Sequence, residues 1–129
     1  MGISESEKGV LRDLARRVAE IAAHPKQEER RQLHLRHARL ENVRPLVMTF
    51  PEGSWRELLP ESVLVTQDKM ARAWEWGLRS TIYQWEHFNH DLVTEPIIVV
   101  GLVRKSTGWG VEASRIPSTE TLGAWRFDP

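Results

Sequence analysis

The chain has no cysteine, no excess of charge of either sign and no long hydrophobic run. Without cysteine, disulfide bonds, thiolate nucleophiles and cysteine-ligated zinc sites are all excluded. Lysine and arginine total 18, as do aspartate and glutamate, so the formal net charge is zero. A nucleic-acid-binding protein needs a basic excess to match the phosphates, so we expect no nucleic-acid partner. Zero net charge gives little protection against self-association, which favours a homo-oligomer.

Targeting and membrane-spanning segments are also missing from the pattern. The first ten residues, MGISESEKGV, are polar and lack the basic and apolar regions of a signal peptide. No apolar run approaches the ~20 residues needed to span a bilayer. We therefore expect a cytoplasmic protein with no membrane association.

The length of 129 residues suits a single domain covering residues 1–129. We expect it to consist of a helical part over residues 4–40, an α/β part over residues 44–116 and an irregular tail over residues 117–129. The order of the predicted elements is two helices, a strand, a short helix, a long helix and a buried strand, which favours an α/β fold.

Local patterns indicate where the helices begin and end. Ser4 and Glu7 fit a capping box, and the helix that follows places apolar residues on one stripe at a period of 3.6. Pro25 ends this helix and begins a second one, which runs to about residue 39. A third, long helix begins at Thr66 or Asp68. Its apolar face is Met70, Trp74, Gly77, Leu78, Thr81, Ile82 and Trp85.

Two segments are predicted as strands. Residues 46–50 form a short apolar run bounded by prolines, and residues 92–103 are rich in β-branched residues and continuously apolar around Pro96. Continuous apolarity is typical of a strand that is buried on both faces of a parallel sheet. Pro96 cannot donate a hydrogen bond to a sheet, so it should lie at an end, an edge or a bulge.

Five titratable residues lie within residues 86–95, in the turn between the long helix and the second predicted strand. Glu95 is the candidate catalytic acid or base, because a carboxylate at the mouth of an apolar strand has a perturbed pKa. Alternatively, the strand begins at Pro96 and Glu95 is solvated in the turn. His87, His90 and Asp91 are candidate ligand-binding residues. The two histidines do not share a helical face at i, i+4, so no metal site is predicted.

Two further surfaces have the composition of binding sites. Trp76, Arg79 and Tyr83 share one face of the long helix and are residue types enriched at protein interfaces, although neighbouring elements would cover the same face in a compact fold. The second predicted helix carries several arginines and histidines between residues 30 and 39. Because glutamates flank them, a solvated helix face is the favoured interpretation over an anion site.

The run LRDLARRVAEIAAHPKQEERRQLHLRHARLENVRPLVM, followed by RSTIYQWEHFNHDLVTEPIIVV, resembles the N-terminal region of uroporphyrinogen decarboxylase-like proteins, which are related to corrinoid-dependent methyltransferases. The resemblance covers roughly residues 11–111 and is most specific over residues 83–88 and 95–100. It implies the helix-rich N-terminal portion of a (β/α)8-barrel-type protein with two or three short strands. A complete barrel takes about 250 residues, so this chain is not expected to form one.

The resemblance implies a non-catalytic N-terminal part or short homologue of such a protein. In the methyltransferase relatives the zinc ligands come from later strands, so no cofactor is expected on this chain alone, and a corrinoid partner belongs to the parent family. Decarboxylases of the family have arginines after the first strand, where residues 48–53 read MTFPEG. Porphyrinogen decarboxylation is therefore not expected, and the chain is not expected to be active alone.

Two alternatives to this interpretation remain. The chain is a stand-alone interaction or regulatory module that self-associates or pairs with a partner chain, for which the Trp76, Arg79 and Tyr83 face and unpaired strand edges argue. Or it is a small independent enzyme that uses Glu95 with His87 or His90.

Overall fold

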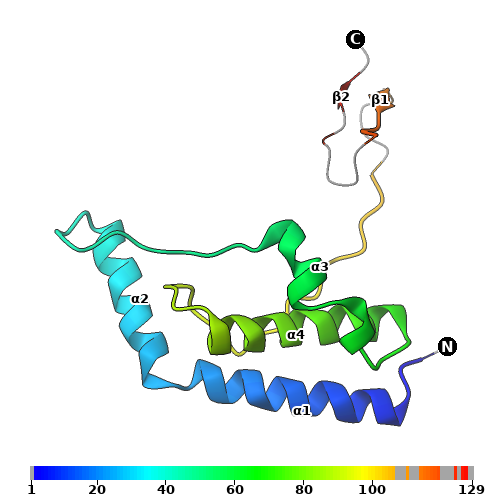
Figure 1. Cartoon of the computed structure of the whole chain (residues 1–129), viewed down its shortest axis with the longest axis horizontal. Helices are drawn as coiled ribbons and strands as arrows, with labels where there is room; N and C mark the ends of the chain where they lie inside the picture. The colour runs from blue at the N-terminus through cyan, green and yellow to red at the C-terminus, as the bar shows by residue number, and fades with distance from the viewer. Residues whose placement is uncertain (1, 107–109, 111–113, 120–123, 125, 128–129) are drawn as a thin grey trace. The chain divides into compact units, whose positions relative to one another are not determined.

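A computed structural model describes residues 2–106, 110, 114–119, 124 and 126–127 (Figure 1). By internal contacts the chain divides into two units, Met1–Ile97 and Ile98–Pro129. The first unit contains the helices α1 (Glu5–Ala22), α2 (Pro25–Ala38), α3 (Trp55–Leu58) and α4 (Lys69–His87), with 3-10 turns at Glu52–Ser54 and Glu61–Val63. In the second unit, β1 (Arg115–Ile116) and β2 (Arg126–Phe127) pair antiparallel.

Helices α1 and α4 lie side by side and run in the same direction (Figure 1). Their starts are joined by Glu7, whose carboxylate accepts hydrogen bonds from the backbone N–H groups of Gln67 and Asp68 at 2.7 and 2.9 Å. Near the other end, the ring of His24 lies 5.0 Å from that of Trp85 in an edge-on arrangement. The core of the unit lies between these helices and includes Val18, Ile21, Ala22, Ala71 and Leu78.

The predicted helix starts are confirmed. Ser4 and Glu7 form the capping box at α1, and Pro25 is the first residue of α2. Asp68 caps α4 by accepting hydrogen bonds from the N–H groups of Met70 and Ala71 at 2.9 and 3.1 Å. These side chains satisfy donors that have no partner within the helix, which is why the starts can be located from sequence alone.

The predicted apolar face of α4 is only partly correct. Leu78 is buried as expected, but Met70 is 52% exposed. The buried face instead includes Ala71, Glu75 and Leu78, at spacings of four and three residues. The prediction failed at Met70 because Glu75 occupies a core position. A prediction based on the spacing of apolar residues cannot identify a buried glutamate.

Helix α2 ends in a Schellman motif, in which Leu40 N–H donates to His37 O at 3.0 Å and Glu41 N–H donates to Arg36 O at 3.1 Å. This motif puts Leu40 in the left-handed region, at φ 59°, where glycine is the favoured residue. Leu40 is also 92% exposed, so its side chain contributes nothing to the core.

The strands predicted over residues 46–50 and 92–103 were wrong, because both segments are extended but form no sheet with any described residue. The first segment is bonded to the residue just before the second one, by a backbone hydrogen bond from Asp91 N–H to Val47 O at 2.7 Å. A strand requires a neighbour to pair with its backbone groups, and neither segment has one in the described chain. The helix-rich character is confirmed, whereas the sheet is limited to β1 and β2.

Among the described residues, no helix is both long and apolar enough to cross a membrane.

Candidate functional site

A polar stripe on α2 holds the chain that follows α4. The stripe consists of Gln27, Arg30, Arg31 and His34, and we call it the α2 polar stripe. Arg30 Nη1 donates to Leu92 O at 2.9 Å, and His34 Nε2 lies 2.8 Å from Asp91 O. Gln27 Oε1 accepts from Thr94 N–H at 2.9 Å. Three backbone groups of an irregular segment are thus satisfied by side chains of one helix.

Asp91 lies at the centre of this contact and is buried. Arg44 donates two hydrogen bonds to its carboxylate, at 2.6 and 2.7 Å, and Val47 N–H donates a third at 2.8 Å. These partners, with Arg44 first among them, hold the pKa of Asp91 far below its usual range. The carboxylate is therefore ionised at neutral pH, and its hydrogen bonds fix residues 44–47 against the segment that follows α4.

Three buried polar atoms in this region have no hydrogen-bond partner among the described residues: Gln27 Nε2, Arg30 Nε and His90 Nδ1. His90 is 5% exposed, and burial followed by the charge of Arg30 lowers its pKa. Its imidazole is therefore neutral at neutral pH. The Arg30 guanidinium lies 5.3 Å from the ring of Trp85, a cation–π contact that offsets part of the cost of burying the charge.

The structure does not assemble the predicted catalytic and ligand-binding residues into one site. Glu95 lies on the surface, with its side chain 47% exposed, and forms a two-point ion pair with Arg31 at 3.1 and 3.2 Å. His87 is exposed at the end of α4, where its ring lies 4.2 Å from that of Tyr83. Within the described residues no group of three or more histidine, aspartate or glutamate side chains is placed to hold a metal ion.

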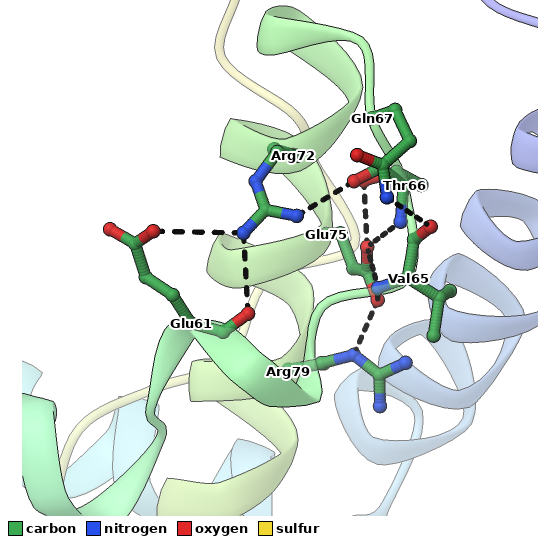
Figure 2. Close-up of polar contacts among 7 residues, drawn as sticks. All are labelled: Glu61, Val65, Thr66, Gln67, Arg72, Glu75 and Arg79. Carbon is green, nitrogen blue, oxygen red and sulfur yellow. Dashed lines mark hydrogen bonds and ion pairs between the residues drawn. The ribbon is translucent and has the colours of Figure 1, made fainter.

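A second buried carboxylate, Glu75, organises the segment that precedes α4 (Figure 2). It has no exposed surface and accepts hydrogen bonds from Val65 N–H, Thr66 N–H, the Thr66 hydroxyl and Arg79 Nε, at 2.7–3.1 Å. Burial alone would raise the pKa of Glu75, but the hydrogen bonds from Thr66, Val65 and Arg79 outweigh it and lower the pKa to about 2. Glu75 is therefore a permanent anion with a structural role.

Arg72 completes the same network. Its guanidinium donates to Thr66 O at 2.8 Å and to Glu61 O at 3.2 Å, and it lies 3.7 Å from the Glu61 carboxylate (Figure 2). Arg72, one turn before Glu75, therefore holds residues 61–66 against α4, whereas Arg79, one turn after Glu75, neutralises the charge of Glu75 within the helix. Arg79 was predicted as an interface residue, and in the structure its Nε is committed to Glu75.

The other predicted interface residues form an aromatic cluster with α3. The ring of Trp55 lies 5.6 Å from Trp76 and 5.9 Å from Tyr83, edge-on in both cases. Helix α3 therefore covers part of this face, as the alternative interpretation anticipated, and Trp76, Arg79 and Tyr83 are all half-buried. A shallow pocket of about 420 Å³ opens beside the two tryptophans.

Sequence reasoning missed the α2 polar stripe and Glu75. Gln27, Arg30, Arg31 and His34 are spaced i, i+3, i+4 and i+7, which is the periodicity of one helix face. The glutamates that flank Arg30, Arg31 and His34 favour a solvated helix face, whereas the spacing of the stripe is that of a contact face. Glu75 has the same spacing relative to Ala71 and Leu78.

No protein-family model matches the chain, and searches of curated proteins and of solved structures found no match either. The role of the site therefore follows from the chemistry of its residues alone. Its buried carboxylates are ionised and paired with arginines or backbone donors, an arrangement that fixes loops in position.

Proposed function

We propose that the chain is a non-catalytic interaction module that supplies residues 98–103 as a strand to the β-sheet of a larger α/β assembly. The observation that carries this proposal is the exposure of this segment. Its five large apolar residues are 51–104% exposed: Ile98, Val99, Val100, Leu102 and Val103. Soluble proteins rarely expose a contiguous apolar run of this kind unless it is a binding surface.

The apolar character of residues 98–103 favours a particular kind of binding partner. Adjacent residues of an extended chain point to opposite sides, and here both sides are apolar. A strand at the edge of an antiparallel sheet would expose one polar side, whereas a strand inside a parallel sheet is covered by helices on both sides. The partner is therefore a neighbouring strand of a sheet whose two faces carry helices.

Backbone hydrogen bonding supports the same proposal. No backbone hydrogen bond joins residues 98–103 to another described residue. With respect to the described part of the chain, their N–H and C=O groups can therefore pair with a second strand, as in the addition of a strand to a sheet edge. Fully burying one valine, leucine or isoleucine side chain contributes about 1.5–3 kcal/mol, so five of them provide a substantial driving force.

The resemblance to uroporphyrinogen decarboxylase-like proteins gives this assembly a concrete form. In that interpretation, residues 46–50 and 92–100 correspond to early strands of a (β/α)8-barrel-type protein. The remaining strands come from a partner chain or from further residues of a longer polypeptide. Any corrinoid chemistry belongs to that larger assembly, since Glu95 and Asp91 are both held by arginines on this chain.

The experiment is to measure association and backbone protection together. In a solution of the chain alone, the sheet of the larger assembly is absent. Copies of the chain should then pair with one another through residues 98–103 as the protein concentration rises. We expect light scattering to show concentration-dependent association, and hydrogen-exchange mass spectrometry to show protection appearing in residues 98–103.

Leu102→Lys should abolish both effects. Leu40→Lys is the matched control, because Leu40 is 92% and Leu102 86% exposed, and it should associate like the unmodified chain. A chain that stays monomeric at high concentration, with fast exchange throughout residues 98–103, would contradict the proposal.

A further inference from the structure

The pocket beside α3 has walls suited to a particular kind of ligand. It has a volume of about 420 Å³, which is within the range of small-molecule sites, and its lining residues are Trp55, Arg56, Leu59, Pro60, Glu61 and Trp76. Leu59 is buried and forms part of the apolar wall, whereas Arg56 and Glu61 are exposed residues that bring one charge of each sign. The strand-pairing role proposed above does not use this pocket.

The two tryptophans stand nearly perpendicular to each other. Their ring centroids are 5.6 Å apart and their planes meet at 76°. Tyr83 continues the cluster behind Trp55, at 5.9 Å and 74°. Perpendicular aromatic walls present ring faces in two directions, which is the arrangement that surrounds an alkylammonium group. Tryptophan is the side chain whose ring attracts a cation most strongly.

No cation from the described residues lies over these two rings. Among the described residues, the cation–π contact that the structure contains is Arg30 over Trp85, at the far end of α4. Arg56 lines the pocket but does not lie over either indole, and its long side chain can extend into water. No described cation therefore competes for the parts of Trp55 and Trp76 that line the pocket.

Glu61 supplies the complementary charge. Its side chain is 91% exposed, so its carboxylate can turn toward the pocket. Its one ion pair, with Arg72, is long at 3.7 Å, and both guanidinium hydrogen bonds of Arg72 go to backbone oxygens, those of Thr66 and Glu61. The Arg72 contact therefore leaves the Glu61 carboxylate able to face a bound ammonium group.

We propose that this pocket binds an organic cation, with Trp55 and Trp76 as its aromatic walls and Glu61 as its counter-ion. The cation is either a free quaternary ammonium compound or the methylated side chain of a lysine in another protein. Both share the same chemistry, a bulky, weakly hydrated positive group that ring faces and one carboxylate can enclose.

The test uses three probes on the full chain. Choline represents the free cation, an N-acetylated trimethyllysine amide represents the protein side chain, and 3,3-dimethylbutanol is the uncharged isostere of choline. Binding is followed by NMR through the indole N–H signals, assigned with Trp55→Phe and Trp76→Phe. We expect the two cations to shift the Trp55 and Trp76 signals, and the alcohol to leave them nearly unchanged. The tighter of the two cations identifies the source.

Variants separate the charge from the aromatic walls. Trp76→Phe should weaken cation binding about threefold to tenfold, because phenylalanine is a poorer cation–π partner. Glu61→Gln should weaken it about threefold, as expected for an exposed ion pair. Glu57→Gln is the matched control, since Glu57 is exposed on α3 but does not line the pocket, and it should bind like the unmodified chain.

Thermal unfolding shows whether each variant remains folded. The exposed Glu61→Gln change provides a test that does not depend on the aromatic packing. Equal binding of 3,3-dimethylbutanol and choline would overturn the proposal, because the pocket would then select only for shape. The absence of shifts at Trp55 and Trp76 with either cation, up to high millimolar concentrations, would overturn it as well.

Discussion

Glu75 and Asp91 are buried carboxylates with charged or backbone donors as partners. Glu75 anchors a loop to helix α4, and Asp91 joins two irregular segments. Glu75 accepts hydrogen bonds from Val65, Thr66 and Arg79, while Asp91 accepts from Arg44 and Val47. In both cases the carboxylate accepts hydrogen bonds from backbone N–H groups of an irregular segment. Single side chains therefore replace the secondary structure that would otherwise satisfy these segments.

Glu75→Gln should destabilise the chain by about 2–3 kcal/mol at pH 7, because the variant loses a buried charge that four hydrogen-bond donors surround. The pKa of Glu75 is about 2 in the folded chain, against an ordinary value of 4.5. Its contribution is therefore complete above about pH 4.5 and is lost as the pH falls toward 2.

Urea unfolding at pH 7 and pH 3 measures how much Glu75 contributes to the free energy of unfolding. Glu29→Gln is the control, because Glu29 is exposed on α2. The difference between Glu75→Gln and the unmodified chain should shrink at the lower pH. A difference that stays the same at both pH values would show that the charge of Glu75 is not the cause.

His90 changes stability with pH in the same direction as Glu75, but it is buried as a neutral imidazole and not as an anion. Burial, then the charge of Arg30, lowers its pKa below the ordinary 6.5, while Asp91 partly opposes the shift and Lys26 adds to it. As the pH falls through 6.5, the unfolded chain takes up a proton that the folded chain refuses until its own lower pKa is reached. The free energy of unfolding should therefore decrease as the pH falls from 7.5 to 5.

His90→Gln should remove this part of the pH dependence, and unfolding curves across that pH range measure it. His37→Gln, at an exposed position near the end of α2, should leave the slope unchanged. An identical slope in the His90→Gln variant would exclude His90 as its source.

At the scale of elements, α2 makes its tertiary contact through polar side chains. Its buried residues are Gln27 and Arg30, and they hold residues 92–94 by hydrogen bonds to the backbone. Such contacts depend on matched geometry, so removing one partner leaves a buried group unsatisfied.

Gln27→Ala should therefore destabilise the contact between α2 and residues 92–95 by about 1–3 kcal/mol, because Thr94 N–H loses its acceptor in a buried position. We expect faster hydrogen exchange at Thr94. Gln32→Ala is the control from the same helix, since Gln32 bonds only to the exposed Glu28 at 2.7 Å. Equal exchange at Thr94 in both variants would mean that the Gln27 bond contributes nothing.

At the end of α2, a substitution is expected to stabilise the chain. Leu40 adopts φ 59° in the Schellman motif, a conformation that costs a residue with a Cβ roughly 1 kcal/mol or more. Leu40→Gly should therefore raise the free energy of unfolding by about 1 kcal/mol, measured by urea denaturation. Leu40→Ala keeps the Cβ and should not raise it, so a gain in the alanine variant would point to loss of the exposed side chain instead.

At the scale of the molecule, the chain divides between residues 97 and 98, and residues 98–106 are extended and exposed. Arg104 and Lys105 lie in this stretch. A protease cuts extended, exposed backbone far faster than helical or hydrogen-bonded backbone. Trypsin should therefore cut first after Arg104 or Lys105, and the fragment that ends there should retain the helical content and unfolding midpoint of the first unit.

Mass spectrometry of a short digestion identifies the first cut, and circular dichroism follows the fragment. The double variant Arg104→Gln/Lys105→Gln should delay cleavage without altering the unfolding midpoint. Earlier cutting after Arg39, an exposed residue at the end of α2, would contradict this division of the chain.

The helices were determined largely by the sequence itself. Ser4, Glu7, Pro25 and Asp68 act on backbone groups within a few residues of themselves, so their effect does not depend on the rest of the chain. The apolar stripe of α1 ends in the buried Val18 and Ile21, again as its spacing predicts. Local hydrogen bonds and helical periodicity are sufficient for these features.

The tertiary structure decided which polar residues became buried and which apolar ones did not. Whether Glu75, Gln27 and Arg30 face water or protein depends on donors and acceptors that arrive from distant parts of the chain, at positions that the sequence does not mark. The apolar residues 98–103 show the converse, because apolar character provides a driving force for burial but no described segment of the chain covers them. The type of each side chain determines the free energy that a contact would contribute. The arrangement of distant segments determines whether that contact forms.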